Sequence, residues 1–179
     1  APRQGFAAPL TLPDASYSHQ LVAPVATAAH EDPAWAERCW HLVHLGSRAL
    51  GGASLVITEM TDVSPEGRIS PGCAGMYKPE HVAAWQRVTR FVHAHSTAKI
   101  GVQLAHAGRK GSARMPWEAR GQGGTAPPDP WQTIAPSAIP FGDDWAPPRA
   151  MTQDDIDRVR EAFALAARRA VRCGFDAIE

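Results

Sequence analysis

Residues 99–110, with the sequence KIGVQLAHAGRK, join a short apolar strand to a polar tip. Apolar side chains alternate over residues 99–104, which predicts a buried β-strand that breaks at Ala105. One amide and three basic or titratable side chains lie at its end: Gln103, His106, Arg109 and Lys110. In a parallel α/β protein, side chains at the carboxyl ends of strands face the binding crevice. This segment therefore predicts a recognition site rather than core.

Strand-like and helix-like segments alternate along the rest of the chain. Short apolar runs predict strands over residues 21–23, 54–59, 99–104 and 175–179. Apolar residues at three- and four-residue spacing predict helices over residues 34–50, 79–95 and 152–173. The last helix has the clearest signals, since Thr152 and Asp155 are placed as a weaker form of capping box and Gly174 follows the end. The order βαβαβαβ predicts parallel strands joined by right-handed crossovers.

Residues 107–150 interrupt this alternation. They contain eight of the sixteen prolines and three of the six tryptophans, without a regular apolar period. Loops of this length inside a compact domain usually carry function, and in barrel enzymes they wall the active site. The alternative is a disordered linker, but the tryptophans argue against it because disordered segments are poor in aromatic residues.

Composition and charge exclude several classes of protein. The chain has 179 residues, 44% hydrophobic content and a formal net charge of zero. We therefore expect no binding to nucleic acid or to an anionic membrane surface. No run approaches the roughly 18 apolar residues of a membrane helix, and residues 1–10 lack the apolar core of a signal peptide. A complete TIM barrel usually needs about 250 residues, more than this chain has.

The cysteines and histidines indicate no metal centre. The three cysteines, Cys39, Cys73 and Cys173, are far apart and form no CxxC motif. Reduced thiols in a cytoplasmic protein are the expected state. His41 and His44 have a spacing that metal ligands can use, but no third ligand accompanies them, so no metal site is predicted.

The motif in residues 99–110 closely resembles the third-strand motif of the Old Yellow Enzyme family, the FMN-dependent ene-reductases on a TIM barrel. Sequence segments that resemble this family also occur at residues 5–12, 21–28, 40–52, 55–70 and 174–179. The segments WHLVHLGSRALGG, SPEGRISPGC and FVHAHSTAKIGVQL are most similar to the reductase domain of salicylyl-CoA and anthraniloyl-CoA monooxygenase-type proteins. The resemblance implies the first half, strands one to four, of a (β/α)8 TIM barrel. Residues 1–179 would form the N-terminal part of one FMN-binding domain, with a long proline-rich loop at 107–150.

The resemblance also implies a cofactor site. In the family, the amide at the position of Gln103 reads the pyrimidine edge of the flavin, which suits a group that both donates and accepts. The resemblance places backbone groups at Met60 against the flavin. It places the end of the first strand beneath the flavin: Ala23, Pro24, Val25 and Ala26. The alternatives are a strand-end amide that satisfies loop backbone for Gln103, and a gap-filling core residue for Met60.

Two residues depart from the family pattern, and two are expected to face the substrate. Ala26 stands where the family has a Cys or Thr that hydrogen-bonds the flavin and tunes its potential. Ala28 stands where the family has a Tyr that touches the substrate. Arg109 is the second predicted substrate-binding residue, holding an anionic group such as a CoA phosphate. The alternative for Arg109 is a structural arginine that bonds loop carbonyls.

The activity implied by the resemblance is hydride transfer from NADH or NADPH, through FMN, to an activated C=C. The proposed substrate is a small molecule, with a CoA thioester derived from an aryl acid as the candidate. The family's substrate-anchoring His-x-x-His or His-x-x-Asn pair would follow Glu179, so no catalytic residue is predicted within residues 1–179. The phosphate site is expected from later strands, and residues 1–179 alone should bind FMN weakly or not at all and be inactive. The alternative is a non-catalytic half-barrel without flavin, whose open strand edges would favour a homo-oligomer.

Overall fold

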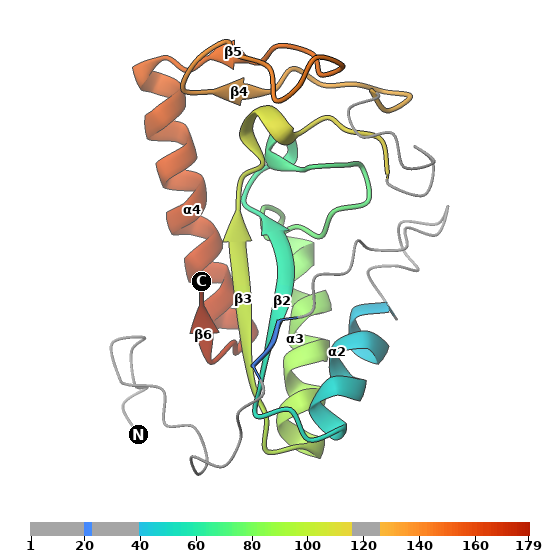
Figure 1. Ribbon diagram of the computed structural model, residues 1–179. Coiled ribbons are helices and arrows are strands. Elements are labelled where there is room, and N and C mark those ends of the chain that lie inside the picture. Colours follow the sequence, from blue (N-terminus) through green and yellow to red (C-terminus); the bar gives the residue numbers. More distant parts are fainter. Residues whose placement is uncertain (1–19, 23–39, 116–125) are drawn as a thin grey trace.

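The computed structural model describes residues 20–22, 40–115 and 126–179, and its core is one parallel sheet with helices on one side (Figure 1). The sheet order is β1-β2-β3-β6, and every neighbouring pair is parallel. The strands are β1 (Gln20–Val22), β2 (Leu55–Asp62), β3 (Lys99–Ala105) and β6 (Ala177–Ile178). The helices are α2 (His41–Leu50), α3 (Pro79–His95) and α4 (Gln153–Cys173). The predicted alternation of parallel strands and helices is confirmed.

The helix ends follow local chemistry that the sequence shows. Pro79 occupies the first turn of α3, where a missing backbone N–H costs nothing. The Thr152 hydroxyl accepts from the backbone N–H of Asp155, and the Asp155 carboxylate accepts in return from the Thr152 backbone N–H. This reciprocal pair starts α4, and Gly174, with φ of 87°, ends it in the left-handed conformation that glycine tolerates best.

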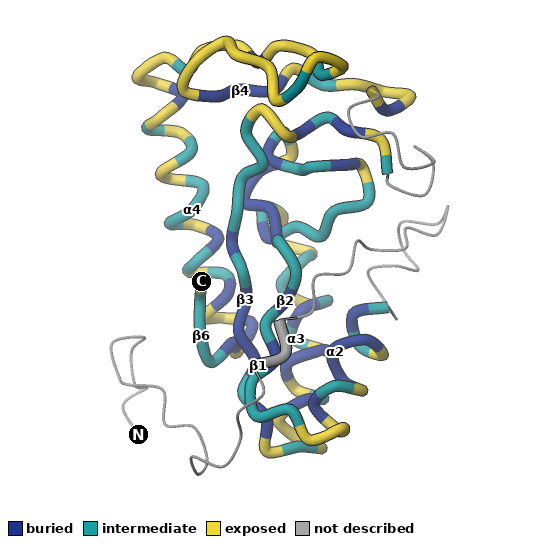
Figure 2. The backbone as a smooth tube through the Cα atoms, in the orientation of Figure 1, coloured by how far each residue is buried: buried dark blue, intermediate teal, exposed yellow. Residues whose placement is uncertain are grey.

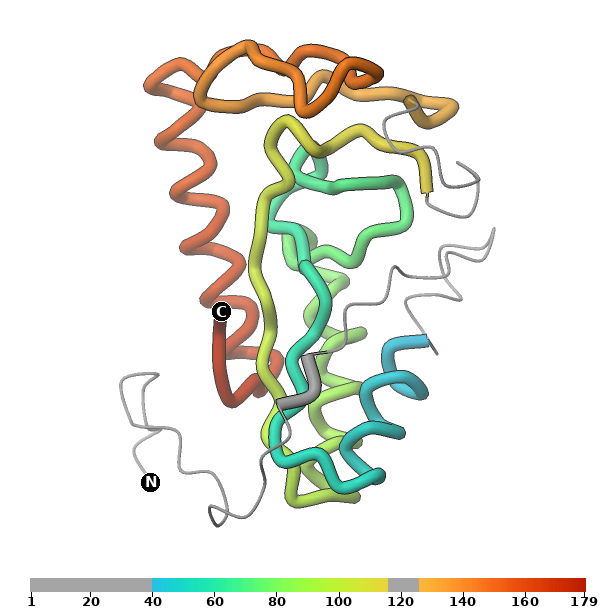
Figure 3. The backbone as a smooth tube through the Cα atoms, in the orientation of Figure 1, coloured from blue at the N-terminus to red at the C-terminus, as the bar shows by residue number. Residues whose placement is uncertain are grey.

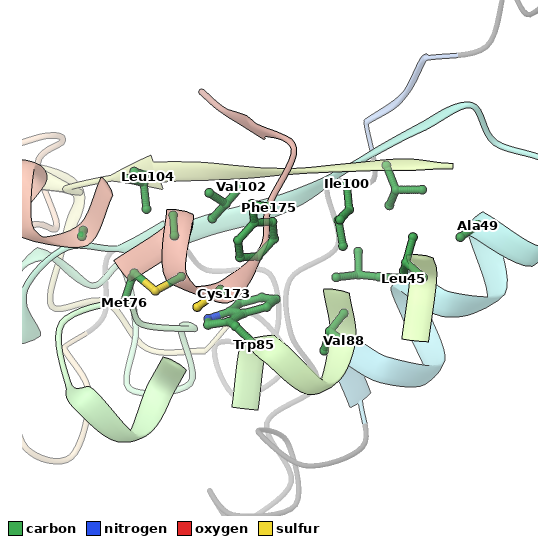
Figure 4. Close-up of a cluster of buried hydrophobic side chains, with 14 of the residues drawn as sticks. Leu45, Ala49, Met76, Trp85, Val88, Ile100, Val102, Leu104, Cys173 and Phe175 are labelled. Carbon is green, nitrogen blue, oxygen red and sulfur yellow. The ribbon is translucent and has the colours of Figure 1, made fainter. Parts of the chain in front are cut away.

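The hydrophobic core lies between the sheet and the three helices (Figure 4). Ile100, Val102 and Leu104 of β3 point to the helices, because alternate residues of a strand share one face. Trp85 of α3 packs against Phe175, with ring centroids 5.5 Å apart. The dark blue stretches of β2, β3 and the inward helix faces in Figure 2 trace this core.

A second layer, which we call the cover segment (residues 126–151), lies across the carboxyl ends of β2 and β3 (Figures 1 and 3). The sequence predicted no regular structure in residues 107–150, and this was wrong in part. The region contains a 3-10 turn, η3 (Gly108–Lys110), and a parallel pair of two-residue strands, β4 (Ile134–Ala135) and β5 (Arg149–Ala150). A two-residue strand is too short to show a periodic apolar pattern in the sequence. Its pairing depends on another segment of the chain.

Side-chain contacts fix the cover segment to the rest of the protein. The Arg149 guanidinium contacts both carboxylate oxygens of Asp155, at 2.6 and 2.9 Å, which ties β5 to the start of α4. The Trp131 indole N–H donates to the Glu66 carbonyl at 3.0 Å, and the Arg68 guanidinium lies 4.9 Å from the centroid of the Trp131 ring. The cover segment is therefore held over the strand ends from both sides.

Element boundaries differ modestly from the predictions. The second strand was expected over residues 54–59 and runs from Leu55 to Asp62; its polar last residues, Thr61 and Asp62, gave no apolar pattern. The first helix, expected over residues 34–50, is described from residue 41 onward. No described helix is long and apolar enough to cross a membrane. Cys73 and Cys173 are free thiols.

Candidate functional site

The candidate site lies where β2, β3 and β6 end, on the sheet face opposite the helices. Met60 and Gln103 are direct partners in the β2–β3 register. Gln103 lies between Val102 and Leu104, both of which point to the helical core, so its own side chain projects from the other face. Both Met60 and Gln103 are half-buried. The structure thus brings together two of the residues predicted to contact a flavin.

A bulge in β2 supports the backbone of Gln103. The register between β2 and β3 shifts between Ile57 and Met60, so Thr58 and Glu59 together oppose one residue of β3. The Thr58 hydroxyl accepts from the Gln103 backbone N–H at 3.1 Å and lies 3.2 Å from the Thr61 hydroxyl. A side chain thereby replaces the ladder hydrogen bond that the bulge removes, and the end of β3 keeps its position.

The Gln103 amide has one specific partner. Its Nε2 donates to the Glu179 carboxylate oxygen Oε1 at 3.2 Å. Glu179 is held in the sheet, since its N–H donates to the Val102 carbonyl and its own carbonyl accepts from Leu104 N–H, both at 2.9 Å. Among the described residues, none donates a hydrogen bond to the side-chain amide oxygen, Oε1, of Gln103.

Two acidic side chains of β2 lie in surroundings that favour their neutral form. Asp62 is fully buried, and neither of its carboxylate oxygens has a hydrogen-bond partner among the described residues. Burial raises the pKa of Asp62 to about 8, against smaller opposing effects of the Arg68 charge and of the neighbouring Cys73 thiol, whose own pKa is raised by burial and by Asp62. Burial likewise raises the pKa of Glu59 to about 7. Sequence reasoning missed both groups, although acidic residues inside the run ITEMTDV were a visible signal.

The polar tip after β3 divides into a packed part and an exposed part. His106 Nδ1 accepts from the Gly108 backbone N–H at 3.1 Å, and burial lowers the pKa of His106, so the ring is neutral at pH 7. Arg109, predicted to face the substrate, is exposed on η3. Lys110 Nζ lies 5.6 Å from the centroid of the Phe141 ring in the cover segment. The other predicted substrate residue, Ala28, lies outside the described residues, as do Ala23, Pro24, Val25 and Ala26.

The described residues fit the edge of a flat heterocycle that carries both N–H and C=O groups. The Gln103 carbonyl oxygen can accept from a ring N–H, while the second Nε2 hydrogen can donate to a ring carbonyl. On the same sheet face beside this amide, the small residues Gly101 and Ala177 are adjacent in the register. No group of three or more metal ligands occurs in the described part of the chain.

Comparison with known proteins assigns the family. The model of the NADH:flavin oxidoreductase / NADH oxidase family matches residues 6–179. The chain belongs to this family. An NADPH dehydrogenase of Geobacillus thermodenitrificans is 40% identical over 142 residues, which are 79% of this chain and 37% of the relative. An NADH:flavin oxidoreductase of Gibberella zeae is 37% identical over 179 residues, 96% of this chain and 42% of the relative.

Solved structures agree with this NADH:flavin oxidoreductase assignment. Morphinone reductase superposes with a TM-score of 0.66 at 28% identity, covering 88% of this chain and 42% of that one. A structure of morphinone reductase with tetrahydroNAD gives 0.62 at 30% identity, over 79% and 39%. The Old Yellow Enzyme homologue of Zymomonas mobilis gives 0.59 at 30% identity, over 77% and 37%. The chain thus spans less than half the length of each relative named here.

These findings confirm the predicted family and fold class. The structural neighbours are TIM-barrel enzymes of the Old Yellow Enzyme type, and the parallel α/β sheet of this chain corresponds to part of such a barrel. Members of the family use FMN with NADH or NADPH as reductant. The narrower resemblance to aryl-CoA monooxygenase-type reductase domains, and the individual site residues, remain predictions.

Proposed function

We propose that the protein is an FMN-dependent NAD(P)H oxidoreductase of the Old Yellow Enzyme type, with residues 1–179 as the N-terminal part of its barrel domain. The observation that carries the proposal is the Gln103 amide, held at the carboxyl end of β3 beside Met60 with its carbonyl oxygen directed away from Glu179. Family membership supports the cofactor, and the parallel topology supports the barrel.

Each part of the chain has a proposed task. Gln103 orients the pyrimidine edge of FMN, and the backbone at Met60 supports the ring from β2. The other side of the ring contacts the end of the first strand, at Ala23, Pro24, Val25 and Ala26. When bound, FMN accepts hydride from NADH or NADPH and passes it to an activated C=C. The cover segment limits the access of water to the strand ends, which strengthens electrostatic contacts to a bound ligand.

The substrate is a separate proposal. The resemblance to aryl-CoA hydroxylases favours a CoA thioester as the small-molecule substrate, with Ala28 leaving room for it and Arg109 contacting a phosphate. The exposure of Arg109 on η3 beside the cover segment is compatible with this task. The relatives named above support NAD(P)H-dependent flavin reduction and do not bear on this substrate class.

The test uses the product of the complete open reading frame that carries residues 1–179, here called the full-length protein. We expect it to bind FMN and to bleach the flavin absorbance when NADH or NADPH is added without oxygen. Gln103→Ala should weaken FMN binding about tenfold, since it removes the amide hydrogen bonds to the pyrimidine edge of the ring. Gln153→Ala is the matched control, because Gln153 is an exposed glutamine whose amide donates to Asp157 of the same helix, α4.

Two results would contradict the proposal. One is a full-length protein that binds no FMN, and the other is equal FMN affinity in Gln103→Ala and the unaltered protein. The same titration on residues 1–179 alone tests the expectation of weak or undetectable binding by this part.

A further inference from the structure

We propose that Glu179 is a positioning residue, which fixes the orientation of the Gln103 amide for recognition of the cofactor. The inference rests on the proposed function, because the ligand it serves is FMN. It concerns one contact, the 3.2 Å hydrogen bond from Gln103 Nε2 to Glu179 Oε1, between residues 76 positions apart in the chain.

The sheet determines where the Glu179 side chain points. Its backbone N–H and carbonyl both pair with β3, at 2.9 Å each. Two residues earlier, Ala177 lies on the same face as Gly101, since a Cβ built on Gly101 would lie 3.5 Å from the Ala177 Cβ. Ile178 between them packs against the core. Alternation therefore returns Glu179 to the face that carries Gln103, so the contact follows from the strand pairing itself.

A carboxylate distinguishes the two ends of an amide. It only accepts hydrogen bonds, so it can pair with the NH2 group of Gln103 and repels the carbonyl oxygen. A rotation of the amide by half a turn would place two oxygens together and lose the hydrogen bond. Glu179 thus holds the Gln103 NH2 group toward β6 and leaves the carbonyl oxygen to accept from a ring N–H.

The backbone of Gln103 is fixed as well, through the hydrogen bond from its N–H to the Thr58 hydroxyl. With the backbone held and the amide bonded to the exposed Glu179 carboxylate, less conformational freedom remains to be lost when a ligand binds. Such preorganisation raises affinity by lowering the entropic cost of binding. Glu179 also places a carboxylate next to the ring edge, where it opposes any gain of negative charge by a bound flavin on reduction.

The experiment is a double-mutant cycle on the full-length protein, with the FMN dissociation constant and midpoint potential as readouts. Glu179→Ala should weaken FMN binding about fivefold to tenfold. In the Gln103→Ala background the same substitution should change it less than about twofold, because a residue that acts through Gln103 has nothing left to position. Glu179→Gln, whose carbonyl can still accept from Nε2, should restore affinity to within about threefold and shift the potential to a more positive value.

The control is Glu161→Ala, which removes an exposed carboxylate of α4 that pairs with Arg168 and should change neither readout. Additive losses from Glu179→Ala and Gln103→Ala would overturn the inference and leave the proposed function intact. Unchanged FMN affinity and potential in Glu179→Ala would do the same. A full-length protein without FMN affinity would overturn the proposed function, and the inference with it.

Discussion

The two faces of β3 carry different kinds of residue on one backbone. Toward the helices, Ile100, Val102 and Leu104 are buried in the core. Toward the other side, Gly101 lies against Ala177 and Ile57, and Gln103 presents an amide that donates to Glu179. Because the side-chain period of a strand is two, consecutive residues serve packing and recognition in turn.

This difference shows how a barrel scaffold separates stability from chemistry. The helix-facing side is apolar and closely packed, so changes there should alter the free energy of unfolding. In the proposed function the opposite side meets the ligand, so changes there should alter binding with little effect on folding. The comparison is most informative where adjacent residues can be altered one at a time.

The largest expected effect is on the helix-facing side. Ile100→Ala should lower the free energy of unfolding by about 3 kcal/mol, because Ile100 is fully buried and the truncation leaves a cavity among the core residues. Urea denaturation of the purified protein measures this loss. Ile139→Ala, at a position 58% exposed in the cover segment, is the matched control and should change stability by less than about 0.5 kcal/mol. Equal losses of stability in the two variants would contradict the idea that the helix-facing side of β3 carries stability.

Asp62 provides a second test, because it is a buried acid near the end of an otherwise packed strand. Its pKa is about 8 in the folded protein and near its ordinary 3.8 when unfolded, so between these values the folded state holds an extra proton. The free energy of unfolding should therefore fall as pH rises from 5 to 8, by up to about 1.4 kcal/mol per pH unit. Below pH 4 this penalty is absent, and above pH 8 it is complete.

Asp62→Asn, an uncharged residue of similar shape, should remove most of this slope and raise the free energy of unfolding most strongly at pH 8, where the penalty of the buried charge is complete. Denaturation curves collected at several pH values measure both quantities. Glu59→Gln is the companion variant, because the pKa of Glu59 is raised to about 7 and should contribute a second slope over lower pH values. Parallel pH profiles for the unaltered protein and Asp62→Asn would show that Asp62 is charged when buried.

Much of the fold could be predicted from local sequence patterns. The helix α3 was predicted with its observed bounds, and α4 began and ended where Thr152 and Gly174 indicated. Strand β3 extended one residue beyond the prediction. These elements are long or have strong end signals, so neighbouring residues are sufficient to define them.

The remaining features depend on residues far apart in sequence. The bulge at Thr58 follows from the register between β2 and β3, and the Gln103–Glu179 contact follows from the pairing of β3 with the segment after α4. Neither leaves a periodic pattern. The short β4–β5 pair, and the backbone pairing of buried Asp62 with Ala74 and Met76, also join segments that no local pattern connects. Local patterns indicated where the site lies but not which side chains support one another there.

A smaller effect is expected at the start of α4. The later turns of this helix contribute Ala166, Ala170 and Cys173 to the core. Thr152→Ala should lower the free energy of unfolding by about 1 kcal/mol, since it removes the side-chain acceptor for the Asp155 N–H. Thermal or urea denaturation measures the loss, and Gln153→Ala, one residue later and exposed, is the control. A loss no greater than that of the control would show that the Arg149–Asp155 contact, rather than the cap, holds this helix end.

The smallest expected effect is at Gly101, directly beside Ile100 but on the opposite face. A Cβ at this position would lie 3.5 Å from the Ala177 Cβ and the Ile57 Cγ1, which is ordinary van der Waals contact. Gly101→Ala should therefore leave the free energy of unfolding unchanged or raise it by up to about 0.5 kcal/mol, because alanine loses less backbone entropy on folding. Urea denaturation of Gly101→Ala and Ile100→Ala, carried out together, compares the change in the free energy of unfolding at these two neighbouring residues. A loss above 1 kcal/mol would mean that this face is packed as tightly as the helix-facing one, and that stability and recognition are not separated along β3.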